Sequence, residues 1–336
     1  MSVDWREQHP LEIMPAVPAY LRGAFGQRMA LIHAGRRKRR EIAQGVHDFY
    51  RRLVPHLRDL GFEIGFQTIQ PRINYGPPGR HIHISTYGRW PGMERSPALH
   101  ANWGYLPGYW YFDPRGYRWN SSIAQMRFDP TEIDGEAAQT LFGQLRRRFV
   151  KHGTSFHHQP ESTDIDVPKD YILVLLQGQD NPLRVGAFLD EVGMLRAVLA
   201  GRDGRPVLVK HHPRARNPVT ERFLADAVTP ADGVQVVEGN LHDLLERAIA
   251  VTCLNSGTGF EAFLHRRPVI VFGQTDYHHC AETVRDPHDF PEALERALDR
   301  RRPYPKFVWW FLSQTCIAVD APDFEERITK QLMARL

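Results

Sequence analysis

Between residues 170 and 273, short apolar runs alternate regularly with segments of helical periodicity. The run at 171–176 is continuously apolar, as is typical of a strand buried on both faces of a parallel sheet. Further strands are predicted at 206–210, 234–237, 250–254 and 269–272, and helices at 188–200, 220–227, 241–248 and 260–265. Strands that alternate with helices in this way predict a doubly wound parallel sheet.

The chain before residue 166 is less regular and is rich in Pro, Gly, His and aromatic residues. It predicts an amphipathic helix at 41–60, strands at 62–66 and 81–85, and a second helix at 135–151. The aromatic stretch at 104–117 is expected to be a loop, and the polar stretch at 152–169 is typical of a linker. These patterns divide the chain into domains at 1–166 and 167–310 and a helical tail at 311–336.

Cysteine usage and hydropathy exclude several classes of protein. Cys253, Cys280 and Cys316 are odd in number and widely spaced, which excludes a disulfide framework and a zinc knuckle. No apolar run approaches the roughly 20 residues of a membrane helix, and the first residues lack the apolar core of a signal peptide. We therefore expect a cytoplasmic protein. Its net charge of +4 favours an anionic partner such as a nucleotide, an acidic sugar or a lipid headgroup.

Polar clusters follow three of the predicted strands, at residues 177–181, 210–214 and 255–259. In open parallel sheets, ligands bind beyond the carboxyl ends of the strands, so we expect these clusters to form a site. In the last cluster, Gly257 and Gly259 allow a ligand to approach the backbone, while Ser256 and Thr258 can cap the following helix or bind phosphate. An ordinary helix cap remains the alternative, because the spacing matches neither a Walker A loop nor a dinucleotide fingerprint.

Taken together, these motifs resemble the capsule polysaccharide biosynthesis proteins, a family of retaining β-Kdo glycosyltransferases. Residues 210–214 are similar to the family's Lys-Pro-His-Pro stretch, and residues 255–264 to its Asn-Ser-x-Thr-Gly-Phe-Glu-Ala-Leu helix start. The resemblance covers about residues 171–273. It implies a GT-B-like α/β fold with two Rossmann-like domains whose parallel sheets face a central cleft. The domain at 1–166 would lie on the acceptor side, and the domain at 167–310 would bind the nucleotide sugar.

The resemblance also implies roles for individual residues. Asp180 would be the nucleophile of a retaining transfer, although by itself it could cap the next helix. His212 would stabilise the departing phosphate. The family's Glu-Asp-Gly-Phe-x-Arg-Ser element is replaced by residues 112–118, which leaves Asp113 as the candidate acid/base. The implied donor-binding residues are Gln177, Lys210, His212, Asn255, Ser256, Gly257, Thr258 and Glu261.

The implied partners are a CMP-activated sugar donor and a glycan or glycolipid acceptor, with no metal or other cofactor and no nucleic acid. The histidine pairs at 81/83, 157/158 and 278/279 lack an Asp, Glu or Cys that would complete a metal site. The basic run at 36–40 could be a solvated helix start or a peripheral contact with the inner membrane, and the aromatic residues at 103–119 could stack on a sugar or fill a core.

The alternative functions are another CMP-donor transferase, either sialyltransferase-like or a glycerophosphotransferase, and a non-catalytic GT-B-like protein of capsule assembly.

Overall fold

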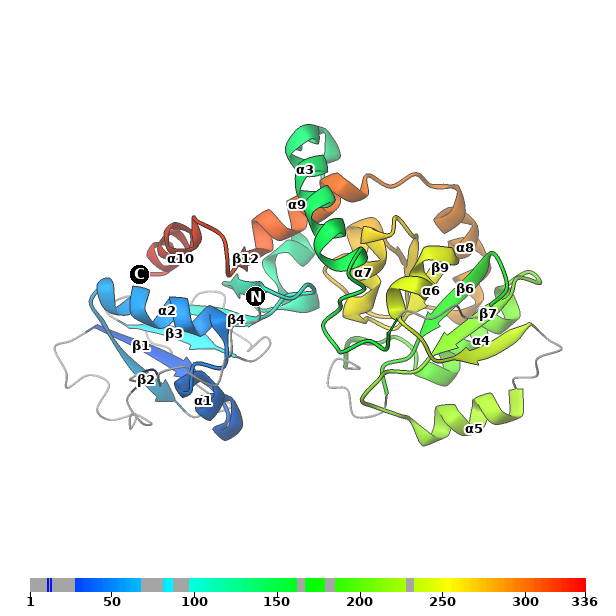
Figure 1. Cartoon of the computed structure of the whole chain (residues 1–336), viewed down its shortest axis with the longest axis horizontal. Helices are drawn as coiled ribbons and strands as arrows, with labels where there is room; N and C mark the ends of the chain where they lie inside the picture. The colour runs from blue at the N-terminus through cyan, green and yellow to red at the C-terminus, as the bar shows by residue number, and fades with distance from the viewer. Residues whose placement is uncertain are drawn as a thin grey trace. The chain divides into compact units, whose positions relative to one another are not determined.

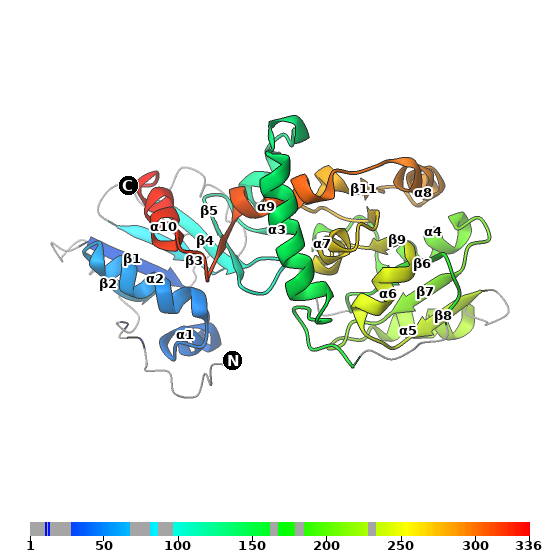
Figure 2. The same ribbon diagram turned by 45° about the horizontal axis from the view of Figure 1, so that its top comes forward.

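The computed structural model describes residues 11, 13, 28–67, 81–86, 97–161, 167–178, 185–227 and 233–336. The chain divides into two compact units, which are coloured along the chain in Figures 1 and 2. Unit 1 combines Met1–Gln125 with Leu312–Leu336, and unit 2 is Met126–Phe311. This division differs from the boundary at 166 and the separate tail that the sequence predicts.

Unit 1 is built on a mixed six-stranded sheet with the strand order β12-β5-β4-β3-β1-β2. Its strands are β1 (Arg28–His33), β2 (Phe62–Gln67), β3 (Ile82–Ser85), β4 (Ala98–Trp103), β5 (Tyr109–Asp113) and β12 (Cys316–Ala318). The first four are mutually parallel, whereas β5 runs antiparallel to β4 and β12 antiparallel to β5. The expected loop at 104–117 therefore contains a strand, and the expected helical tail contributes another.

Helices cover one face of this sheet. They are α1 (Arg36–Ala43), α2 (Asp48–Asp59) and α10 (Phe324–Met333). Leu53 of α2 and Ile328 of α10 join a core that includes Ile32 and Ile84 of the strands. In both views α2 and α10 lie over the same side of the sheet (Figures 1 and 2). The C-terminal residues thus complete the hydrophobic core of the N-terminal unit.

The single helix predicted at 41–60 is two helices in the structure. Helix α1 ends at Ala43, Gly45 has φ +67°, and α2 begins at Asp48. Glycine adopts this left-handed conformation without the steric cost of a side chain, and the conformation ends a helix. The apolar periodicity continues across the break, which is why the sequence pattern did not reveal it.

Unit 2 contains a parallel six-stranded sheet with the strand order β11-β10-β9-β6-β7-β8. Its strands are β6 (Tyr171–Leu175), β7 (Val207–Lys210), β8 (Val234–Val237), β9 (Ala248–Cys253), β10 (Val269–Val271) and β11 (Glu282–Thr283). The first five lie within two residues of their predicted positions. The doubly wound parallel sheet is confirmed.

Helices lie on both faces of this sheet, as the two views show (Figures 1 and 2). The helices of unit 2 are α3 (Gly135–Leu145), α4 (Glu191–Gly201), α5 (Pro218–Ala227), α6 (Leu241–Arg247), α7 (Gly257–Leu264), α8 (Phe290–Asp299) and α9 (Tyr304–Thr315), the last of which continues into unit 1. Helices α4, α5 and α8 share one core with the strands, while α6 and α7 pack against β6, β9 and β10. Within the described ranges, no helix has both the length and the apolar character needed to cross a bilayer.

Residues before β6 belong to unit 2 because hydrogen bonds attach them to it. Arg146 Nη1, just after α3, donates to the carbonyl oxygen of Leu264 at 2.6 Å. Asn240 Nδ2 donates to the carbonyl oxygens of Gly153 at 3.4 Å and Pro160 at 3.0 Å. The polar stretch predicted as a linker is therefore fixed in place up to residue 161, and residues 162–166 lie outside the described part of the chain.

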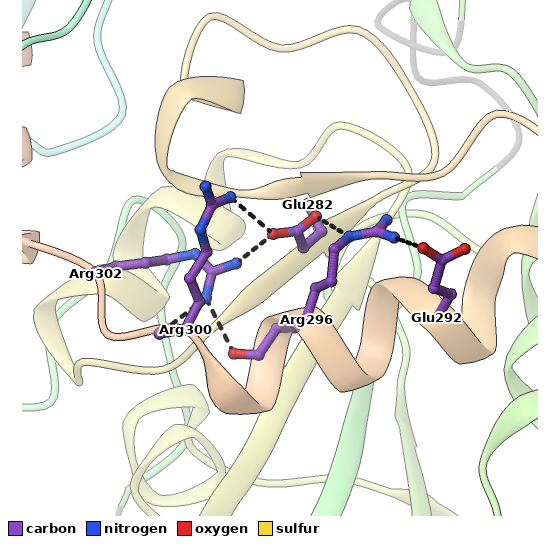
Figure 3. Close-up of polar contacts among 6 residues, drawn as sticks. Glu282, Glu292, Arg296, Arg300 and Arg302 are labelled. Atoms are coloured by element: carbon purple, nitrogen blue, oxygen red, sulfur yellow. Dashed lines mark hydrogen bonds and ion pairs between the residues drawn. The ribbon is translucent and has the colours of Figure 1, made fainter.

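A carboxylate on the edge strand β11 fixes the segment between α8 and α9 (Figure 3). Glu282 accepts hydrogen bonds from Arg296 Nε at 3.1 Å and from Arg302 Nη2 at 2.6 Å, and Arg300 Nη1 lies 3.8 Å away. The side chains of Glu282 and Arg302 are only 11% and 5% exposed. Arg296 also pairs with the exposed Glu292 on its own helix, at 2.7 Å.

We predict that Glu282→Gln lowers the free energy of unfolding by about 3 kcal/mol, because it leaves the buried Arg302 without its counter-charge. Glu292→Gln is the matched control, since Glu292 contacts the same Arg296 but its side chain is 75% exposed. We expect the control to change stability by less than about 0.5 kcal/mol. Urea denaturation of both variants measures the difference, and equal losses would show that burial of Glu282 contributes nothing.

Candidate functional site

The site predicted from the sequence lies at the carboxyl ends of the strands of unit 2. Strands β6 and β9 are neighbours in the sheet, although the chain leaves β6 for β7 on one side and returns from β8 to β9 on the other. Such a reversal of strand order is a topological switch point, where open α/β sheets bind ligands. Gln177 follows β6 and Asn255 follows β9, so these two residues flank the switch point.

The side chains of Gln177 and Asn255 are joined across the switch point. Gln177 Nε2 donates to Asn255 Oδ1 at 3.0 Å, and the backbone N–H of Asn255 donates to Gln177 Oε1 at 2.8 Å. Both residues are buried. This paired amide holds the two central strand ends at a fixed separation.

The buried carboxylate of Glu191, which the sequence analysis did not single out, contacts the backbone at the end of β6. Glu191, at the start of α4, is 1% exposed. Its Oε1 accepts the backbone N–H groups of Gln177 at 2.6 Å and Gly178 at 2.8 Å. Its Oε2 accepts from Asn217 Nδ2 at 3.1 Å and Thr220 Oγ1 at 2.8 Å. Four donors compensate for the burial of this charge, and they tie the end of β6 to the starts of α4 and α5.

The turn after β7 approaches the end of β6 closely because residue 178 is glycine. Gly178 has φ +77°, and a Cβ there would lie 2.9 Å from the backbone carbon and oxygen of Ala215. Within the turn, the backbone N–H of Arg214 donates to His212 Nδ1 at 3.2 Å. This bond favours the neutral tautomer with its proton on Nε2, which leaves an N–H free to donate to an anion.

His157 is a second imidazole at this turn. Its ring packs edge-on against the ring of His212, with 5.0 Å between the centroids and 77° between the planes. Its Nδ1 is buried and has no hydrogen-bond partner among the described residues. From the sequence, His157 is expected only as part of an incomplete metal pair, because the segment that carries it is typical of a linker. Gln159, whose Oε1 accepts the backbone N–H of Leu241 at 3.1 Å, helps to fix that segment.

The basic groups here are desolvated. Burial, together with the neighbouring His157 and Arg214, lowers the pKa of His212 to about 4. Burial, with Arg214, also lowers the pKa of His157. Lys210 is 8% exposed, and burial lowers its pKa, which Glu238 partly offsets. No described carboxylate forms an ion pair with Lys210. A desolvated lysine beside two imidazoles that can donate N–H groups favours the binding of an anion.

The serine turn starts α7 at the end of β9. Ser256 is the N-cap, and its Oγ accepts the backbone N–H of Thr258 at 3.2 Å. Tyr277 donates its hydroxyl to the carbonyl oxygen of Ser256 at 2.6 Å. The turn is therefore a capped helix start, as the alternative interpretation held, and it also directs the positive end of the helix dipole to the edge of the sheet where ligands bind.

Asp113 lies in unit 1 at the end of β5 and is 3% exposed. Its Oδ1 accepts the backbone N–H groups of Arg115 at 2.7 Å and Gly116 at 3.1 Å. Ser122 donates its N–H to the carboxylate, at 3.0 Å to Oδ2, and its hydroxyl also bonds to Oδ2. The carboxylate thus holds a loop together, and its role as an acid/base stays a prediction.

The remaining predicted residues are placed as follows. Asp180 lies outside the described residues. Glu261 is buried in α7, and Gly257 is the first residue of that helix. Their functional roles stay predictions. Among the side chains that the structure describes, no three of His, Cys, Asp and Glu are grouped so as to hold a metal ion.

Comparison with known proteins identifies the stretch that carries this site. Residues 135–297, just under half of the chain, match the family of capsule polysaccharide biosynthesis proteins. Over these residues the chain is similar to that family. The matched stretch contains the amide pair, Glu191, the turn after β7 and the serine turn. No protein of curated function matches the chain by sequence.

The fold extends the similarity beyond residues 135–297. Thermosulfurimonas dismutans KpsC, beta Kdo 2,7 transferase, is similar with a TM-score of 0.54 and 15% identity, over 92% of this chain and 99% of that one. The beta Kdo 2,4 transferase of the same organism's KpsC gives a TM-score of 0.53 and 18% identity, over 85% and 90% of the two chains. Likeness at these identities shows a shared fold. The predicted GT-B-like class is confirmed as two α/β units, the first with a mixed sheet.

The close packing of α7 on Tyr277 gives a first test of the site. A Cβ at Gly259 would lie 2.6 Å from the Tyr277 hydroxyl oxygen. We predict that Gly259→Ala lowers the free energy of unfolding by about 1–2 kcal/mol, although alanine is the better helix former. In a Tyr277→Phe background the contact with the hydroxyl is removed and the closest remaining contact is the ring Cζ at 3.2 Å, so the same substitution should cost at least about 1 kcal/mol less. A double-mutant cycle in urea measures this coupling, and additive costs would contradict the packing argument.

A second test uses pH. The pKa of His212 is about 4 in the folded protein and 6.5 when unperturbed. Between pH 4 and pH 6.5, therefore, the unfolded chain binds a proton at His212 that the folded protein does not bind. His212 therefore makes the protein less stable as pH falls from 6.5 to 4. Relative to the parent, we expect His212→Gln to gain about 1 kcal/mol of stability between pH 7 and pH 5, after discounting for solvent screening of a partly exposed ring. His288→Gln, at a site where the side chain is 93% exposed, should show no such gain. Urea denaturation of the parent and of both variants at pH 7 and pH 5 measures these changes, and an equal gain in the two variants would contradict the assignment to His212.

Proposed function

We propose that the protein is a glycosyltransferase of bacterial capsule or lipopolysaccharide biosynthesis, which transfers an acidic, Kdo-like sugar from a CMP-activated donor. The observation that carries this proposal is the cluster of Lys210, His212 and His157 at the switch point. Its basic groups are desolvated and lack an ion-paired carboxylate among the described residues. The family match and the likeness in fold to KpsC Kdo transferases support the choice of sugar.

The same cluster is suited to stabilise the leaving group. When a CMP-activated sugar reacts, the bond between the anomeric carbon and the phosphate oxygen breaks, and negative charge grows on the departing phosphate. The Lys210 ammonium, the Nε2–H of His212 and the start of α7 would interact more strongly with that charge as it develops. Preorganised groups of this kind lower the barrier because they bind the transition state better than the ground state.

Retention of configuration requires two displacements. In the proposed sequence, Asp180 attacks the anomeric carbon and CMP leaves, so that the sugar is held on the carboxylate. An acceptor hydroxyl then displaces Asp180, and its proton passes to a base. Asp113 is the proposed base, in the unit expected to bind the acceptor.

A second candidate function is a non-catalytic role in capsule assembly. The hydrogen bonds that Asp113 accepts from Arg115, Gly116 and Ser122 favour it, because they give this carboxylate a structural task. A protein of this kind would keep the nucleotide site and lack transfer. Incubation with a CMP-activated sugar and a glycan acceptor, followed by mass spectrometry of the products, separates the two functions.

The nucleotide specificity tests the donor site directly. We predict that CMP raises the stability of the protein by roughly 2.7 kcal/mol at about 100 times its dissociation constant, and that UMP and ADP at the same concentration do not. Lys210→Gln should weaken CMP binding about 10- to 100-fold, because it removes a charge-assisted hydrogen bond to phosphate. Lys151→Gln is the control, at an exposed lysine of the same unit. Thermal shift and calorimetry measure both effects; equal stabilisation by all three nucleotides, or unchanged affinity in Lys210→Gln, would refute the assignment.

A further inference from the structure

Helix α1 in unit 1 presents a concentration of positive charge. Residues 36–40 are all basic, and the first turn of the helix has no acidic residue. Arg36 and Arg40 are exposed, and the side chain of Arg37 is 94% exposed. Arg37 pairs with Glu41 at 2.8 Å, whereas no carboxylate in the described part of the chain pairs with Arg36 or Arg40. The helix therefore carries surplus positive charge at its surface.

An exposed aromatic side chain lies beside this helix. Trp103, at the end of β4, is 39% exposed, and Lys38 Nζ lies 3.8 Å from the centroid of its ring. The ring of His47, which follows the exposed Val46, lies 5.5 Å from the same indole. Burial, with the charge of Arg37, lowers the pKa of Lys38 to about 8 while Glu41 opposes the shift, so Lys38 still carries a positive charge at pH 7.

We propose that this surface, made of Arg36, Arg37, Arg40, Val46 and Trp103, docks onto the headgroup region of a membrane that contains anionic phospholipids. Exposed arginines are attracted to such a surface, and an indole is stabilised at the boundary between headgroups and acyl chains. Val46 is 43% exposed in the turn between α1 and α2. An aliphatic side chain gains stabilisation in the interfacial region of a bilayer but nothing from a charged polysaccharide, which favours a lipid surface over an acidic glycan.

This docking surface goes beyond the proposed function and does not depend on it. All five of its residues belong to unit 1, and none is among the proposed donor-binding groups of unit 2. Peripheral binding through exposed side chains also requires no membrane-spanning helix. A protein that lacked transferase activity would bind the same vesicles.

The test is co-sedimentation of the full chain with vesicles of phosphatidylcholine alone or with about one third phosphatidylglycerol. We expect binding only to the anionic vesicles, and weaker binding as salt is raised, because salt screens surface charge. Each basic residue near such a surface contributes about 1 kcal/mol, so Arg36→Gln combined with Arg40→Gln should weaken binding about 30-fold. Trp103→Ala should weaken binding to the same vesicles without changing the salt dependence.

The matched control removes two exposed arginines from unit 2, by combining Arg147→Gln with Arg148→Gln. It changes the net charge equally and should bind anionic vesicles like the parent, with melting curves confirming that all variants are folded. Equal losses in both double variants would overturn the proposal in favour of unspecific charge attraction. Failure of the parent to bind anionic vesicles at low salt would also overturn it. Binding of polygalacturonate by the parent, lost in the α1 variant without any vesicle binding, would assign the surface to an acidic glycan instead.

Discussion

The buried carboxylate of Glu191 holds the strand ends on which the proposed donor site depends. Taking a carboxylate out of water costs several kcal/mol, and here donors from the end of β6 and the start of α5 offset that cost. Because Glu191 fixes the backbone at Gln177, it also fixes the amide that pairs with Asn255 across the switch point. The positions of the end of β6 and of the serine turn thus depend on the buried charge of Glu191. Glu191 itself is not among the predicted donor-binding residues.

The sequence predicted the sheet of unit 2 well because its signals are local. Each strand is a short apolar run that a helical segment follows, and the polar residues after the runs included Gln177, Lys210, His212 and Asn255. Glu191 and His157 were missed because their partners lie far from them in the sequence. A glutamate at the start of a helix usually faces solvent, and His157 lies in a polar segment whose attachment to Asn240 has no local signature.

Unit 1 was harder to predict for the same reason. Strand β12 pairs with β5 across some 200 residues of intervening chain, so no window of sequence contains both partners. The aromatic residues around β5 resembled a loop because Gly and Pro interrupt them, yet Trp110 packs into the core, where it stacks on Phe49. Trp110 therefore fills the core, whereas Trp103 remains exposed, and the stacking of this stretch on a sugar stays a prediction.

The return of the chain to unit 1 has a consequence for synthesis on the ribosome. Residues 126–311 form unit 2 without interruption, whereas unit 1 lacks β12 and α10 until residues 312–336 emerge. The N-terminal unit is therefore the last to be completed. Until then the edge of β5 is unpaired and the core lacks Phe324, Ile328 and Leu332. An open strand edge and an uncovered apolar face promote association between nascent chains, so this interval is the one in which the protein most needs a chaperone.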